Sequence, residues 1–84
     1  FSVPTSLNDI VIVLFHIVEE HPFVDSTVEN ASNRLKGTMP LIFRESEEGV
    51  QSIVTSADTM IVEGDTVAMI LKQEYLSLAD EING

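Results

Sequence analysis

Apolar residues recur three or four positions apart in four stretches of this 84-residue chain, and proline or glycine separates each stretch from the next. The four sets are Leu7, Ile10, Val11, Leu14, Val18; Val24, Val28, Ala31, Leu35; Val50, Ile53, Val54, Ala57, Ile61; and Val67, Ile70, Leu71, Tyr75, Leu78, Ile82. Side chains with this spacing lie on one face of an α-helix. The spacing therefore predicts an all-α fold, a small four-helix bundle with helices at about 7–20, 25–36, 46–62 and 65–83.

Helix start and stop signals flank each stretch. Ser26 and Glu29 form a capping-box pattern for the second helix, and Gly37 suits the position just after its last turn. The corresponding signals of the other helices are Thr5 or Ser6 with Pro22, Ser46 with Gly64, and Asp65. Agreement between these signals and the spacing favours the bundle.

One region of the chain also fits a strand pattern. Residues 50–71 are rich in Val, Ile, Thr and Ser, and Met60–Val62 could pair with Val67–Leu71 across a Gly-Asp turn. Strict alternation fails within this region, which favours the helical interpretation. The alternative is an α+β fold with a hairpin around residues 59–71. The β-branched run Ile10–Val18 is likewise open to interpretation as a buried strand.

Charge and composition limit the class of protein. The length suits a single domain over residues 1–84, and the apolar content of 44% is typical of a folded chain. A net charge of −10 and the absence of cysteine argue against nucleic-acid binding, disulfides and thiolate metal sites. A basic protein partner would be attracted. The run Ile10–Phe15 is too short to span a membrane, and a start at Phe1 indicates a processed form or an excised piece.

A cluster of His16, Glu19, Glu20 and His21 contains residue types that bind metals. Its spacing misses the standard zinc-peptidase patterns by one residue, and His21 would point away from His16 on a helix. The sequence therefore predicts no metal site and no catalytic set.

Asp25-Ser26 at the start of the second expected helix resembles the acyl and peptidyl carrier proteins, which are small, acidic and helical. The segments Asn33-Arg34-Leu35 and Pro40-Leu41-Ile42-Phe43 are also similar to that family. The resemblance implies a phosphopantetheine attached at Ser26. The loop before the serine is shorter than in the family, and Thr27 stands where the family has leucine.

The segment from Asn33 to Thr38 resembles the histidine-phosphotransfer signature, with Asn33 at the position of the histidine. That family is also a helical bundle. Because the histidine is missing, the resemblance implies a pseudo-phosphotransfer adaptor that carries no phosphoryl group.

The function that the sequence favours is a non-enzymatic, acidic helical module for protein–protein interaction, acting as a subunit, adaptor or regulator without a cofactor. Phe15, Ile17, Met69 and Leu76 fall off the main apolar stripes and are expected to form an exposed interaction patch. The expected partner is another protein, basic or otherwise, or a second copy of the chain.

Overall fold

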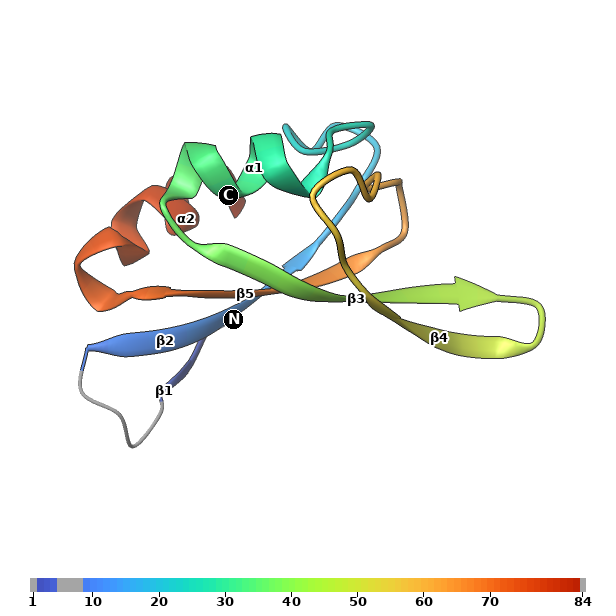
Figure 1. Ribbon diagram of the computed structural model, residues 1–84, viewed down its shortest axis with the longest axis horizontal. Helices are drawn as coiled ribbons and strands as arrows, with labels where there is room; N and C mark the ends of the chain where they lie inside the picture. Colours follow the sequence, from blue (N-terminus) through green and yellow to red (C-terminus); the bar gives the residue numbers. More distant parts are fainter. Residues whose placement is uncertain (1, 5–8, 84) are drawn as a thin grey trace.

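The computed structural model describes residues 2–4 and 9–83, and it contains a five-stranded antiparallel sheet with two short helices instead of a four-helix bundle (Figure 1). The strand order is β1-β2-β5-β3-β4. The strands are β1 (Ser2–Pro4), β2 (Ile10–His16), β3 (Thr38–Ser46), β4 (Gly49–Val54) and β5 (Thr66–Lys72). The helices are α1 (Val28–Leu35), the 3-10 turn η1 (Gln73–Tyr75) and α2 (Leu76–Asn83). The all-α prediction is therefore wrong.

The first and third expected helices are replaced by strands. Within residues 7–20 the structure has β2, and within residues 46–62 it has β4 and an irregular segment. Both regions are rich in β-branched residues, which pack well on a pleated sheet and lose side-chain freedom in a helix. The expected helix cap at Thr5 or Ser6 lies outside the described residues.

The second expected helix, 25–36, is present as the shorter α1, and each of its caps lies one residue from the predicted cap. The N-cap is Thr27, whose hydroxyl accepts the backbone N–H of Asn30 at 3.2 Å. The left-handed residue at the C-terminal end is Lys36, with φ of 56°, and not Gly37. The cap residues Ser26 and Gly37 therefore have other surroundings, described below.

The fourth expected helix, 65–83, divides into β5 and α2. The alternative hairpin around residues 59–71 is also not formed. Strand β5 pairs with β2 and β3, whereas Met60 makes an isolated bridge with Thr27. The alternative thus had the right mixture of strands and helices but the wrong strand pairing, because long-range partners and not the nearby turn decide where β5 lies.

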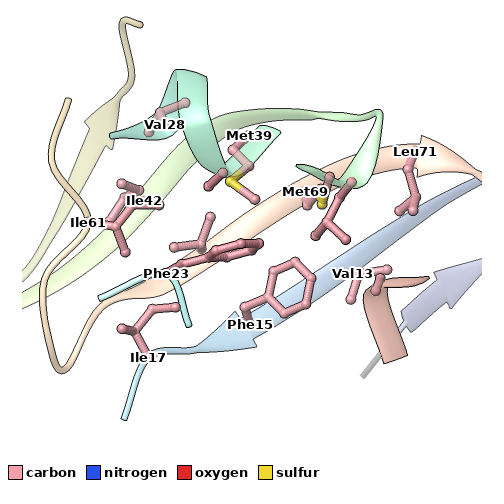
Figure 2. Packing of buried hydrophobic residues seen from close by; sticks show 14 of the residues in the cluster. Val13, Phe15, Ile17, Phe23, Val28, Met39, Ile42, Ile61, Met69 and Leu71 are labelled. Atoms are coloured by element: carbon pink, nitrogen blue, oxygen red, sulfur yellow. The ribbon is translucent and has the colours of Figure 1, made fainter. Parts of the chain in front are cut away.

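Both helices lie on the same side of the sheet, together with the segment between β4 and β5 (Figure 1). The core fills the space between these layers, and Figure 2 shows its side chains converging from strands, α1 and the connecting segments. Phe15 and Phe23 meet edge to face, with ring centroids 6.0 Å apart. The buried apolar residues are Val11, Val13, Phe15, Ile17, Phe23, Val28, Ala31, Leu35, Met39, Ile42, Ile61, Val67, Met69, Leu71 and Ala79.

An ion pair fastens the segment between β4 and β5 to the sheet. Arg44 on β3 donates from Nε and Nη2 to the two carboxylate oxygens of Asp65, each at 2.9 Å, and from Nη2 to the carbonyl of Met60 at 3.0 Å. The Asp65 side chain is completely buried, and it also accepts the backbone N–H of Val62. The hydrogen bond to Asp65 raises the pKa of the Arg44 guanidinium. This arrangement holds the covering segment over the core.

Candidate interaction surface

The side of the sheet away from the helices carries a continuous apolar surface, here called the outer face. Cross-strand partners in an antiparallel sheet point to the same side. The register places the outer-face residues in rows across the strands: Ile10 with Lys72; Ile12 with Ile70; Leu14 with Ala68, Leu41 and Val54; His16 with Thr66, Phe43 and Ser52; and Glu45 with Val50. Aliphatic or aromatic side chains therefore predominate in the middle three rows from β2 to β3, with Thr38 opposite Ile70 and Thr66 between His16 and Phe43 as the polar members.

No element within residues 2–4 and 9–83 covers the outer face, whereas the opposite side of the same strands is buried. Ile70 in the centre of β5 is 38% exposed, and Val54 on the edge strand β4 is 85% exposed. Ile12, Leu41 and Phe43 on the same face are half-buried. Contiguous apolar area of this kind, unlike scattered exposed residues, is typical of a binding surface.

The acidic residues are excluded from the outer face with one exception. Glu45 is the one of the fourteen acidic residues that lies in a strand, and it sits at the end of the face near the β3–β4 turn. The opposite end carries Lys72. A pocket of about 300 Å³ at that end is lined by Ile10, Thr38, Ile70, Leu71 and the two lysines Lys36 and Lys72. Lys72 is the cation of the outer face at this end, whereas the Lys36 ammonium lies 5.3 Å from the centre of the Tyr75 ring.

The interaction patch expected from the sequence lies elsewhere. Phe15, Ile17 and Met69 are fully buried in the core on the helix side of the sheet, and Leu76 packs against that core half-buried at the start of α2. The prediction that these residues are exposed assumed helical faces. In a strand, successive side chains point to opposite sides, so these residues point into the core. Their strand neighbours, Leu14 and Ile70 among them, form the outer face.

A signal for the outer face was present in the sequence. The run Ile10–Phe15 is apolar at every position, so a strand formed by it is apolar on both faces. Because both sides are apolar, the alternation that marks a half-buried strand is hidden. The same run also contains the three- and four-residue spacings of a helix, because every position in it is apolar.

Ser26 lies directly before the helix cap and not at it. Its hydroxyl donates to the carbonyl of Thr27 at 3.4 Å, and its backbone N–H and C=O bond to Phe23 and Ile61. Asn33 and Arg34 are exposed on α1, and the Arg34 guanidinium lies 5.4 Å from the centre of the Phe23 ring. The carrier and phosphotransfer resemblances both imply a helical bundle, which this chain does not form.

The two histidines of the expected cluster separate. His16 points to the outer face, with Nδ1 3.5 Å from the hydroxyl of Thr66. His21 is buried beside Phe15 and Phe23, and its Nδ1 accepts the backbone N–H of Phe23 at 3.1 Å. Among the described residues, no group of three or more potential ligands is placed to hold a metal ion.

His21 makes the stability of the fold depend on pH. Because Nδ1 of His21 accepts a hydrogen bond, Nε2 carries the proton of the neutral ring. This Nε2 has no hydrogen-bond partner within the described part of the chain, and burial lowers the pKa of the imidazole. In the unfolded chain the histidine titrates near its ordinary pKa of about 6.5. As pH falls below that value the unfolded state binds the proton first. The contribution of His21 to stability is therefore fully present above about pH 6.5, and it is lost as pH falls toward the lower pKa of the folded state.

We expect the free energy of unfolding to fall by up to about 1.4 kcal/mol per pH unit from this group as pH decreases below about 6.5. Urea unfolding of the wild type and of His21→Phe between about pH 7 and 5.5 measures it, with exposed His16→Gln as the control. His21→Phe should remove most of the slope, and His16→Gln should keep it. Equal slopes in all three proteins would show that carboxylates cause the effect.

None of the helices within residues 9–83 has the length and apolar character needed to cross a bilayer. No protein-family model matches the chain, and no curated protein shows significant similarity to it. The fold defines an α+β protein, a single antiparallel sheet with helices on one side, and the outer face is its most distinctive surface.

Proposed function

We propose that this protein is a non-enzymatic interaction module that binds another protein chain through its outer face. The observation that carries the proposal is the continuous, uncovered apolar surface over β2, β5 and β3, with Ile70 exposed at its centre. Burying such a surface removes it from water, at about 25 cal/mol for each Å². An apolar sheet face suits a second sheet or an amphipathic helix.

The distribution of charge supports this surface over the others. The helix side and the connecting segments carry the acids outside the strands, which keeps those surfaces hydrated. The apolar side chains of the outer face are not required to fill the core, which lies on the opposite side of the sheet. Their presence at exposed positions supports a binding role for the outer face.

The proposal is tested by cross-linking in the cells that make the protein. A photo-reactive residue is placed at Ile70, and a matched control is placed at exposed Asn33 on α1. We expect covalent protein adducts from position 70 and none of the same mass from position 33. Adding Leu41→Lys to the position-70 protein should abolish the adducts, because it places a charge in the apolar centre.

Two controls make the outcome decisive. Circular dichroism and thermal unfolding must show that Leu41→Lys is folded, and a change in stability of about 1 kcal/mol or less is expected at this half-buried sheet position. Equal adducts from positions 70 and 33, or adducts that persist with Leu41→Lys, would contradict the proposal, as would the absence of any adduct from position 70.

A further inference from the structure

We infer that the outer face pairs with the outer face of a second copy of this chain, sheet against sheet, around a two-fold axis. This inference rests on the proposed binding role of that face. The axis runs across the strands through the row of Leu14, Ala68, Leu41 and Val54. Three independent features of the face fit this arrangement: the order of its apolar rows, the placement of its charges and its area.

The apolar rows on either side of the axis are complementary. Ile12, Ile70 and Thr38 form the row on one side, and Phe43 lies with Thr66 and His16 in the row on the other side. A two-fold rotation about the central row exchanges these two rows. Each strand then lies over its own counterpart, so the ring of Phe43 in one copy lies opposite Thr38 of the other and next to Ile70, one strand away. This contact occurs twice. The central row, with small Ala68 between Leu14 and Leu41, packs against itself.

The charges at the two ends are placed symmetrically about the same axis. Lys72 lies four positions from Ala68 along β5, and Glu45 lies four positions from its partner Leu41 along β3 in the opposite direction. At about 3.3 Å per residue each charge is roughly 13 Å from the axis. The rotation therefore brings Glu45 of one copy to the Lys72 end of the other, one strand apart.

This charge pattern favours a second copy over a strongly basic partner. A basic partner would be drawn to the acids, which lie outside the strands with the exception of Glu45. The outer face itself is neutral in sum between Lys72 and Glu45 when His16 is uncharged. Two such faces can approach without bringing like charges together.

The area of the face is sufficient for a weak, specific dimer. Each position on one face of a sheet occupies about 6.6 by 4.8 Å, so the positions of the outer face cover roughly 450 Å² in each copy. Two copies thus bury about 900 Å² before the relief of the side chains is counted, which is in the range of weak complexes. We expect a dimer that dissociates in the micromolar range. Aligned sheet packing at about 30° suits the twist of both sheets.

The test exploits the exchange of charges that the two-fold axis imposes. In Lys72→Glu, both end contacts of the dimer become Glu against Glu, and in Glu45→Lys both become Lys against Lys. Each variant alone should dimerise at least about tenfold more weakly than the wild type, since every dimer contains two such contacts. A mixture of the two variants pairs Glu with Lys at both ends. We expect mixed dimers to form with near wild-type affinity.

Native mass spectrometry with one variant isotope-labelled counts the mixed and the like dimers, and sedimentation measures their affinities. Glu63→Lys is the matched control, because it makes the same change of charge at an exposed site away from the strands. Mixed with Lys72→Glu, it should give no preference for mixed dimers. A monomeric wild type at about 1 mM, or random pairing of Lys72→Glu with Glu45→Lys, would overturn the inference.

Failure of this inference and failure of the proposed function give different results. An adduct of twice the chain mass of 9.3 kDa at position 70 is expected from a second copy. An adduct of another mass, together with a monomeric purified protein, would retain the binding face and reject the second copy. No adduct at position 70 would reject the proposed function itself.

Discussion

Replacing Arg44 with leucine is expected to lower the free energy of unfolding by about 3 kcal/mol, the range found when one partner of a buried ion pair is removed. Asp65 is completely buried, and Arg44 supplies both of its charged hydrogen bonds. Without the guanidinium the carboxylate stays buried with the backbone N–H of Val62 as its remaining partner. The Met60 carbonyl also loses its donor.

The midpoint of thermal unfolding should fall by roughly 15 °C, since each kcal/mol corresponds to about 4–8 °C in a domain of this size. Urea unfolding of Arg44→Leu measures the free energy directly. The double variant Arg44→Leu with Asp65→Asn separates charge from packing, because it removes the unpaired charge and keeps an acceptor for Val62. We expect it to recover more than half of the lost stability.

The contrary outcome is well defined. If Arg44→Leu and the double variant are equally unstable, the loss comes from the side-chain packing of Arg44 and not from the stranded carboxylate. If Arg44→Leu is as stable as the wild type, the segment between β4 and β5 is held over the core by its apolar contacts, Ile61 foremost among them.

The extent to which the sequence predicts this fold differs between its elements. The helix at α1 is predicted because its apolar residues Val28, Ala31 and Leu35 lie on one face and the opposite face is polar, so a single periodicity fits. Strand β2 has no polar face. A strand that is apolar on both sides satisfies any spacing, and its β-branched residues are then the better guide.

The outer face was missed for the same physical reason. Its members alternate with the core residues along β2 and β5, so the choice between Phe15 and Leu14 as the exposed residue depends on the element type and not on hydrophobicity. Pairing also mattered. The position of β5 between β2 and β3 depends on partners more than 20 residues away in the chain, and local turn signals such as Gly64-Asp65 do not encode it.

The sequence pattern predicts a structural role for Gly37 but gives the wrong physical reason for it. The sequence pattern assigns it to the left-handed position that ends α1, but Lys36 occupies that position with φ of 56°. At Gly37 the constraint is space. A Cβ there would lie 2.5 Å from Cε of Met69, 2.7 Å from the carbonyl oxygen of Ile70 and 3.0 Å from Cβ of Leu71. The glycine allows the chain entering β3 to pass against β5.

We therefore expect Gly37→Ala to lower the free energy of unfolding by about 2–3 kcal/mol, as over-packing does in a tight core. The Met69 side chain can move, but the Ile70 carbonyl belongs to the backbone of β5 and cannot yield without separating the strands. Urea unfolding is the measurement, and an unchanged dependence on urea concentration shows that the folded state has remained compact.

Lys36→Gly is the control that decides between the two explanations of Gly37. A glycine relieves the left-handed strain at position 36, so this variant should be as stable as the wild type or more stable by up to about 1 kcal/mol. If position 37 and not position 36 carried the left-handed strain, Lys36→Gly would give no gain in stability, and Gly37→Ala would cost only the usual left-handed penalty of about 1–2 kcal/mol. Gly37→Val distinguishes these cases further, because steric conflict grows with side-chain size. A progressive loss from Ala to Val, accompanied by amide shift changes in β3 and β5, is expected from close packing of the two strands, and equal losses for Ala and Val would contradict it.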